Sequence, residues 1–250
     1  MNTWQPQQHK VVSREQWLVA RKEHLLHEKA FTRERDKLSA ERRALPWVKV
    51  DKPYSFEGPD GPQSLADLFG GRSQLIVYHF MFAAGWKEGC PGCSFLSDHI
   101  DGANQHLAHH DVAFVVVSHA PLAEFQPFKK RMGWKFNWVS SAGSDFNADF
   151  KVTISDEELT AGTAVYNYEK STSTEGELPG LSVFYRNDAG EIFHTYSTYA
   201  RGLDLLVGAY NYLDLTPKGR NEEEIMEWVR HHDRYEDEPA AKGASSCCSE

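Results

Sequence analysis

Residues 74–107 read QLIVYHFMFAAGWKEGCPGCSFLSDHIDGANQHL, and the expected fold follows from this stretch. An apolar run, Leu75–Val77, leads through a glycine-containing loop to Cys90, Pro91, Gly92 and Cys93. The apolar residues that follow recur at steps of three and four, which is the spacing of one helix face: Phe95, Leu96, Ile100, Ala103 and Leu107. The pattern predicts a buried strand that leads into a helix, with Cys90 at the helix N-terminus and Cys93 one turn inside.

The predicted position at a helix N-terminus affects the reactivity of the two cysteines. The first turn of a helix has unpaired N–H groups and the positive end of the helix dipole, and both favour a thiolate. A cysteine at such a position titrates below its usual value. Two intervening residues let the sulfurs bond without backbone movement, and Pro91 has no N–H to lose there. We therefore expect a redox-active dithiol in which Cys90 attacks and Cys93 resolves.

Two other roles for the cysteines compete with redox chemistry. A CxxC motif is half of a zinc site only when a second pair of ligands completes it. The remaining cysteines, Cys247 and Cys248, are adjacent to each other and far away in the chain. Inert thiols are the other alternative. Because CxxC beside a βαβ pattern is typical of thioredoxin-like proteins, we favour redox chemistry and predict no metal site.

The composition limits the class of protein. The chain has 250 residues, 40% of them hydrophobic, which is enough for a substantial core. The net charge of −9 argues against nucleic-acid binding. No apolar run is long enough to cross a membrane, and the polar N-terminus does not resemble a secretory signal. Few cysteines and no export pattern lead us to expect a reducing, cytoplasmic location.

The N-terminal part is expected to form a helix. Residues 1–12 are predicted to be disordered, and residues 13–45 to be helical, capped by Ser13 with Gln16 as its capping-box partner. Pro46 ends this helix. Its thin apolar stripe is spaced by sevens: Trp17, Phe31, Leu38 and Leu45. Such a stripe predicts packing against the rest of the chain or against a second copy, which would give a homodimer through this helix.

Residues 46–220 are predicted to form an α/β domain, a mixed sheet flanked by helices. The strand at 111–118, DVAFVVVS, is nearly continuously apolar, as a strand covered on both faces requires. An insertion at about 142–177 precedes a predicted hairpin. The other expected elements are an edge strand near 47–50, a turn at 58–61, a short helix at 64–69, a strand at 74–80, a helix at 121–132, a strand at 134–141, hairpin strands at 181–186 and 191–197, and a helix at 201–213.

Residues 221–250 are predicted to be an acidic appendage. A helix is expected at 222–230, and residues 233–250 are expected to be disordered because they are acidic and rich in alanine and serine. Cys247 and Cys248 lie in this tail. They are candidates for relaying electrons to the CPGC motif, with uninvolved thiols as the alternative.

The sequence resembles one known family. The order of a strand, CxxC and helix, a second strand and helix, a hairpin and a closing helix is that of the thioredoxin fold. The segments VSREQWLVARKEHLLHEKAFTRERDKLSAERRALPWVKV, YHFMF, GCPGCSF, FHTYSTYARG and LDLTPKGR resemble the DUF899 family over roughly Val11–Arg220. The resemblance implies a thioredoxin-like fold and dithiol-disulfide oxidoreductase activity without a bound cofactor.

Comparison with thioredoxins implies roles for further residues. Pro179 lies where thioredoxins have a cis-proline, which would present backbone to a substrate chain; an ordinary trans proline is the alternative. The buried aspartate of thioredoxins would fall at Tyr78 or His79. His79 is then a candidate base for Cys93, or a histidine of the core. Gly89 replaces the tryptophan beside the first cysteine, and Trp86 is displaced from it.

Two more side chains are candidates for substrate binding. Trp86, with Phe80 and Phe82, would form an apolar rim around the dithiol, or would pack in the core. Arg201, in the segment FHTYSTYARG, would bind an anion in the cleft, or would belong to a hydrogen-bonded corner between strand and helix. Pro91 and Gly92, between the cysteines, are expected to set the reduction potential.

The sequence thus predicts a thiol–disulfide oxidoreductase. Its substrate would be a disulfide-containing protein or a small-molecule thiol compound, with no cofactor, nucleic acid or membrane involved. One alternative is a thiol peroxidase of peroxiredoxin-like type, in which Cys90 passes through a sulfenic acid. Another is a non-catalytic module whose dithiol senses redox state or binds a metal.

Overall fold

The structure is a computed structural model that describes residues 9–236. These residues separate into two compact units, one ending at Trp47 and one beginning at Val48. Cys247 and Cys248, and most of the tail predicted to be disordered, lie outside the described residues. No helix among residues 9–236 is both long and apolar enough to cross a membrane.

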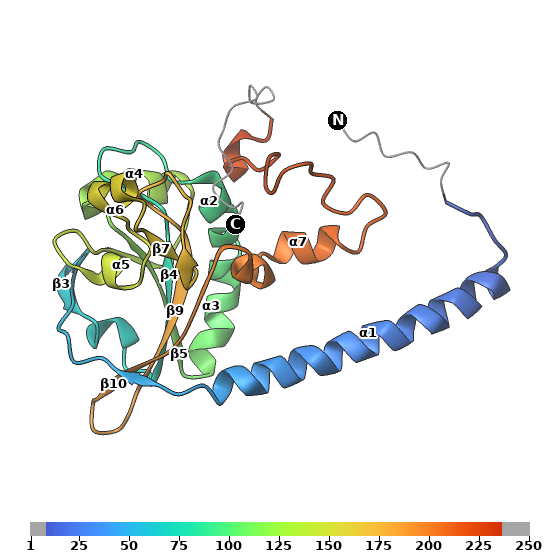
Figure 1. Cartoon of the computed structure of the whole chain (residues 1–250), viewed down its shortest axis with the longest axis horizontal. Helices are drawn as coiled ribbons and strands as arrows, with labels where there is room; N and C mark the ends of the chain where they lie inside the picture. The colour runs from blue at the N-terminus through green and yellow to red at the C-terminus, as the bar shows by residue number, and fades with distance from the viewer. Residues whose placement is uncertain (1–8, 237–250) are drawn as a thin grey trace. The chain divides into compact units, whose positions relative to one another are not determined.

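The first unit consists of helix α1 (Arg14–Arg43), drawn in blue in Figure 1. Its N-terminus carries the predicted capping box: the Ser13 hydroxyl accepts from the Gln16 amide at 3.3 Å, and the Gln16 side chain accepts from the Ser13 amide at 3.2 Å. None of its residues is buried, and Phe31 and Leu38 are 69% and 56% exposed. What covers this stripe, the second unit or another copy of the chain, stays a prediction.

The second unit is built on a sheet of eight strands among the described residues, in the order β1-β10-β9-β4-β5-β6-β2-β3. Strands β4, β5 and β6 are parallel, whereas β9 is antiparallel to β4 and β10 is antiparallel to β9. The strands are β1 (Val48–Lys49), β2 (Ser55–Gly58), β3 (Gly61–Ser64), β4 (Gln74–His79), β5 (Val112–Ser118), β6 (Asn137–Ser140), β9 (Gly180–Arg186) and β10 (Ile192–Tyr199).

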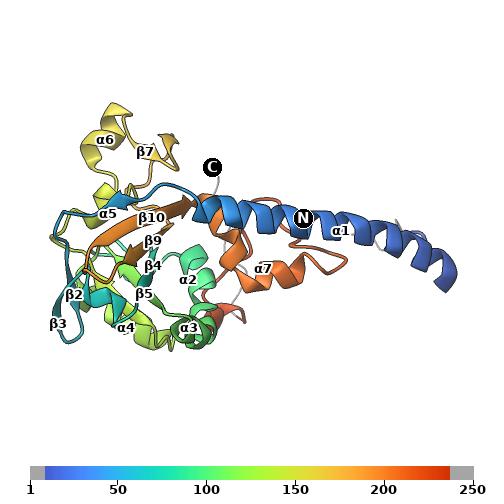
Figure 2. The ribbon, with the colours of Figure 1, turned by 90° about the horizontal axis from the view of Figure 1, so that it is seen from below.

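Both faces of this sheet are covered, which explains the apolar strands. Helices α2 (Pro91–Ser97) and α3 (Ile100–His109) connect β4 to β5, and α4 (Leu122–Arg131) connects β5 to β6 (Figure 2). Side chains of all three pack with Trp138 in one core cluster. On the other face, η2 (Asp67–Phe69) and α5 (Phe146–Asp149) pack against Phe184. A buried parallel strand such as β5 needs this double cover.

The arrangement is a thioredoxin-like fold, as predicted. The β4–α2–α3–β5 unit and the β9–β10 hairpin lie in the order β5-β4-β9-β10, and a short helical segment follows. That segment was predicted as one helix over 201–213. It is instead a 3₁₀ helix, η3 (Ala200–Leu206), followed by α7 (Gly208–Leu213), with Val207 in extended conformation between them.

The insertion has a compact structure of its own. It contains α5, α6 (Asp156–Ala161) and the two-stranded sheet of β7 (Val165–Tyr166) and β8 (Glu169–Lys170). Val152, Tyr166 and Leu178 form a third core cluster with Tyr199 of β10. The insertion therefore packs beside Pro179, close to the end of the sheet where α2 begins.

The predicted helix at 222–230 is wrong. The segment consists of turns, and Met226 has a left-handed backbone (φ 63°). The Glu222 carboxylate accepts from the Met226 amide at 3.1 Å and from the Trp228 indole at 2.9 Å. An acidic side chain that binds nearby donors in this way offers the backbone an alternative to helix. Beyond it, η4 (His232–Arg234) overlaps the start of the range 233–250, which was predicted to be disordered.

Candidate active site

The two cysteines lie at the start of α2, after the loop that follows β4. Cys90 is the N-cap of α2, Pro91 follows at its start, and Cys93 lies in the first turn, as predicted. The amide and hydroxyl of Ser94 both donate to the Cys90 carbonyl, at 2.9 and 2.8 Å. The cysteines do not form a disulfide in this structure, and they are only 6% and 3% exposed.

Cys90 and Cys93 line one small cavity together. Its volume is about 20 Å³, enough for roughly one water molecule. The structure thus brings Gly92, Pro179 and Arg201 to the cysteines, as the sequence suggested. The remaining lining residues come from β4 and the residues after it, α2, the η3 region and the C-terminal segment: Tyr78, Met81, Leu96, Ala200, Leu203, Asp204, Val207 and Met226.

Gly89 fixes the backbone just before Cys90. A Cβ atom at this position would lie 2.4 Å from the Phe80 ring and 2.8 Å from the Phe128 ring, so only glycine fits without rearrangement. The Gly89 carbonyl accepts from Nε2 of His231 at 2.9 Å. Steric packing therefore accounts for a glycine at the place where thioredoxins have tryptophan.

An ion-pair network holds the same loop from outside. The Glu88 carboxylate accepts from Arg131 at 2.5 Å and from Arg234 at 2.9 Å. Arg131 also donates to Asp233 at 2.8 Å and to Nδ1 of His231 at 2.9 Å. Because Arg131 donates to one ring nitrogen and the Gly89 carbonyl accepts from the other, His231 is the neutral Nε2–H tautomer. Burial lowers the pKa of His231, which is consistent with this state.

Pro179, just before β9, and Ala200, the first residue of η3, are tied together by Tyr166 of the insertion. Its hydroxyl donates to the Pro179 carbonyl at 2.7 Å and accepts from the Ala200 amide at 2.9 Å. The Leu178–Pro179 peptide is trans, so the structure does not have the cis bond considered for this position. The insertion thus fixes two segments that line the dithiol cavity.

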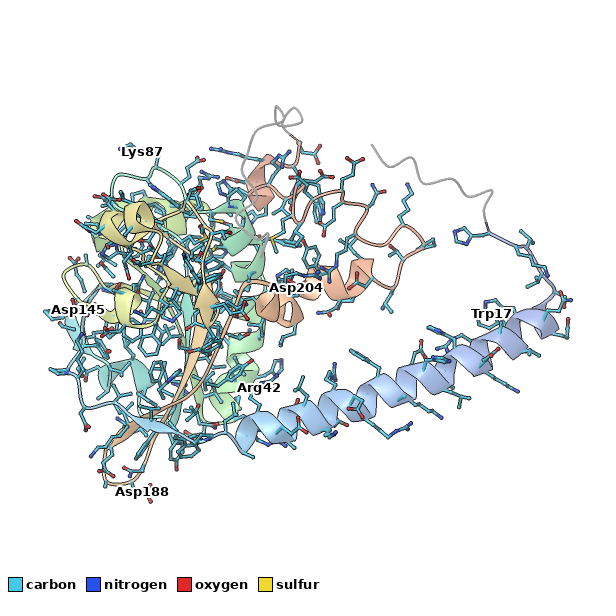
Figure 3. All side chains as sticks on the ribbon, in the orientation of Figure 1. Trp17, Arg42, Lys87, Asp145, Asp188 and Asp204 are labelled. Carbon is cyan, nitrogen blue, oxygen red and sulfur yellow. The ribbon has the colours of Figure 1, made fainter. Side chains whose placement is uncertain are left out.

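Arg201 lies at the mouth of the cavity. Its guanidinium pairs with Asp204 at 3.1 Å, and its side chain is largely exposed. The Asp204 carboxylate, labelled in Figure 3, also forms an ion pair with Arg220 at 3.0 Å. Arg220 forms a second ion pair with Asp214. Because the Arg201 side chain is 60% exposed, its guanidinium also has donors that face solvent.

His79 lies on the opposite face of the sheet from the dithiol, which corrects the idea that it assists Cys93. Successive side chains of β4 point to opposite faces, so Tyr78 lines the cavity and His79 points away. His79 Nε2 is hydrogen-bonded to Ser182 at 2.9 Å, and its ring packs against Phe146. Burial, reinforced by nearby His194, lowers the pKa of His79 to about 3. It is a neutral core histidine.

Trp86 does not line the cavity, which corrects the predicted apolar rim. Its ring packs 6.4 Å from that of Phe82. Phe80 and Phe82 are fully buried, and both rings contact Phe128 and Trp138. The aromatic residues after β4 therefore form core, because neighbouring rings bury more apolar surface against one another than a rim would.

Sequence reasoning missed several residues around the dithiol. Met226 and His231 come from a charged C-terminal stretch, where the apolar residues Met226, Trp228 and Val229 were the available signal for a docked segment. Tyr166 lies in an insertion whose sequence gave no indication of contact with Pro179. Among residues 9–236, no group of three or more His, Cys, Asp or Glu side chains is placed to bind a metal ion.

Residues 6–235 match the model of a family described as "Bacterial protein of unknown function (DUF899)". The chain belongs to the DUF899 family. A comparison with curated proteins found no match.

Several solved structures are similar in fold to this DUF899 protein. Peroxidoxin BcpB from Mycobacterium tuberculosis has a TM-score of 0.44 and 12% identity, covering 68% of this chain and 97% of its own. A PrxQ mutant from Xylella fastidiosa has a TM-score of 0.42 and 12% identity, covering 67% and 94%. A putative thiol:disulfide interchange protein DsbE from Chlorobium tepidum has a TM-score of 0.37 and 12% identity, covering 66% and 97%.

The buried His79 predicts a specific loss of stability in acid. Its folded pKa of about 3 lies below the unfolded value of 6.5, so its contribution to stability is present above pH 6.5. That contribution is lost as pH falls from 6.5 towards 3, by up to about 1.4 kcal/mol per pH unit. Urea unfolding of wild type and His79→Gln between these pH values should show a shallower slope in the variant. The exposed His106→Gln is the control, and equal slopes for His79→Gln and wild type would contradict the assignment.

We expect the Tyr166 hydroxyl to hold the cavity wall beside the dithiol in position, through its bonds to Pro179 and Ala200. Tyr166→Phe removes the link between Pro179 and Ala200 and takes the hydrogen bond from a buried carbonyl and a partly buried amide, costing about 1–3 kcal/mol of unfolding free energy. It should also change the rate at which Cys90 reacts with a thiol reagent. Tyr212→Phe, at an exposed tyrosine, is the control. Unchanged stability and unchanged Cys90 reactivity in Tyr166→Phe would show that the link has no such role.

Proposed function

We propose that this protein is a thiol–disulfide oxidoreductase in which Cys90 is the nucleophile and Cys93 the resolving cysteine. The observation that carries the proposal is that both cysteines line one cavity at the start of α2, together with Pro179. The unpaired N–H groups and dipole at this helix end favour a thiolate at Cys90.

The reaction needs only the two sulfurs and the substrate. The Cys90 thiolate attacks one sulfur of the substrate disulfide, forming a mixed disulfide and releasing the other substrate sulfur as a thiolate. Cys93 then gives up its proton and attacks the Cys90 sulfur, releasing the second substrate thiol and leaving a Cys90–Cys93 disulfide. An external thiol reduces that disulfide and restores the dithiol, so no bound cofactor takes part.

Other residues of the cavity have supporting roles in this proposal. Gly92, which lines the cavity, and Pro91 beside it would set the reduction potential of the dithiol. Arg201, with donors facing solvent at the mouth, would bind an anionic group of the substrate. The few cysteines suit a reducing cytoplasm, where the pair would rest as a dithiol and be ready to reduce a substrate.

Serine variants test the two roles separately. Cys90→Ser removes the nucleophile and should abolish reduction of a disulfide substrate. Cys93→Ser should accumulate a mixed disulfide between Cys90 and the substrate, visible in the intact mass. Full turnover in both variants would exclude the dithiol as the catalyst, whereas Cys247→Ser and Cys248→Ser serve as controls for thiol content.

A thiol peroxidase is the second candidate, favoured by the size of the cavity. A space of about 20 Å³ suits hydrogen peroxide better than a substituted disulfide. The Cys90 thiolate would attack one peroxide oxygen, giving a sulfenic acid and releasing hydroxide, which is neutralised to water. The Cys93 thiol would then condense with the sulfenic acid, forming the Cys90–Cys93 disulfide and a second water.

Stopped-flow measurement of peroxide consumption distinguishes the two functions. A peroxidase should consume hydrogen peroxide much faster than unhindered cysteine does, and Cys90→Ser should abolish the reaction. Consumption at the rate of unhindered cysteine, alongside rapid reduction of disulfides, would rule out the peroxidase.

A further inference from the structure

The C-terminal segment from Asp214 to Tyr235, here called the strap, lies against the dithiol site. Met226 lines the cavity itself. The Trp228 ring packs edge-on against Phe95 of α2, with centroids 5.4 Å apart, and Val229 is buried in the same core cluster. The red end of the strap approaches the start of α2 in Figure 1. The strap therefore closes the side of the cavity that the sheet and its helices leave open.

Polar contacts hold the strap on both sides of Met226. Before it, Arg220 pairs with Asp204 of η3 at 3.0 Å. After it, His231 donates to the Gly89 carbonyl and Arg234 pairs with Glu88. These contacts join the strap to η3 and to the loop that precedes Cys90. The strap is thus docked by directional bonds, with Met226 between its anchors.

Met226 itself is held in an unfavourable backbone conformation. Its φ of 63° lies in the left-handed region, which is uncommon for a residue other than glycine because the Cβ atom crowds the backbone. Glu222 stabilises it, because its carboxylate accepts from the Met226 amide and also from Trp228 and Tyr210. Strain that surrounding contacts maintain is typical of functional positions. Here it directs a flexible thioether side chain into the wall of the dithiol cavity.

Much of the rest of the cavity wall belongs to helices and strands. Tyr78 lies in β4, paired on both sides by β5 and β9, and Leu203 is buried in η3. Met226 lies in a turn of the strap, outside any helix or strand. Its side chain therefore belongs to a part of the wall that neither strand pairing nor helix hydrogen bonds hold.

The size of the cavity limits what can react. An attacking thiolate must approach a disulfide along its S–S bond, so a substituted disulfide needs room on both sides of the bond. With Cys90 6% exposed and a cavity of about 20 Å³, a folded protein cannot bring its disulfide to the sulfur. We propose that Met226 sets the upper size limit for molecules that reach Cys90, and that the substrates of this site are small molecules rather than folded proteins. The inference rests on the proposed function only in taking Cys90 as the nucleophile.

The test measures access to Cys90 without turnover. The full chain carries serine at Cys93, Cys247 and Cys248, so that Cys90 is the one reacting thiol. Thiolation rates are followed by intact mass with two neutral reagents, the small methyl methanethiosulfonate and the bulkier aromatic disulfide dithiodipyridine. Met226→Gly removes the side chain and relieves the strained backbone. Leu215→Gly is the matched control, since this strap residue is 84% exposed and lies outside the cavity.

The proposal predicts a change in size selectivity. Met226→Gly should raise the rate with dithiodipyridine by about tenfold or more, while the rate with the small reagent changes by less than about twofold. Leu215→Gly should change neither rate, and Met226→Leu should keep the selectivity of wild type. Equal acceleration of both reagents by Met226→Gly, or no acceleration of the bulky one, would overturn the proposal. Failure of the proposed function would show separately, as turnover that survives Cys90→Ser.

Discussion

The backbone at Gly89 packs against the rings of Phe80 and Phe128, and the position of the dithiol depends on this contact. Because Gly89 has no side chain, the loop after β4 can pass close to these rings and lead directly into α2 at Cys90. His231 binds the Gly89 carbonyl, and Arg131 and Arg234 bind Glu88 beside it. Residues of α4 and of the C-terminal strap thus hold the backbone at Glu88 and Gly89 in place. This backbone in turn positions the sulfur of Cys90.

The site is assembled from segments far apart in the chain, and this explains its enclosure. The insertion supplies Tyr166, which ties Pro179 to Ala200, and the strap supplies Met226. In many reactive cysteines the sulfur is partly exposed, whereas here both cysteines are buried in the same core cluster as Trp138. The additions to the thioredoxin-like fold therefore contribute to the surroundings of the dithiol: Met226 lines its cavity, and Tyr166 contacts two segments that line it.

Local sequence patterns predicted most of the fold and the centre of the site. Strand β5 and the capping box of α1 follow from near-neighbour residues, and so does the start of α2 at Cys90. The failures depend on distant contacts. His79 and Trp86 are close to the cysteines in sequence, but strand alternation turns one away and ring packing buries the other. The spacing of apolar residues predicts a helix at 222–230, but the Glu222 carboxylate binds the Met226 amide and the segment forms turns.

The most direct test of the account is the equilibrium oxidation of Cys90 and Cys93 in glutathione buffers of graded redox potential. Full-length protein with Cys247 and Cys248 replaced by serine is quenched with acid, and its intact mass and tryptic peptides are analysed. The account predicts one two-electron transition in which both thiols lose their hydrogens together and a single Cys90–Cys93 disulfide forms. Two thiols that stay reduced at every potential, or that form only separate glutathione adducts, would contradict it.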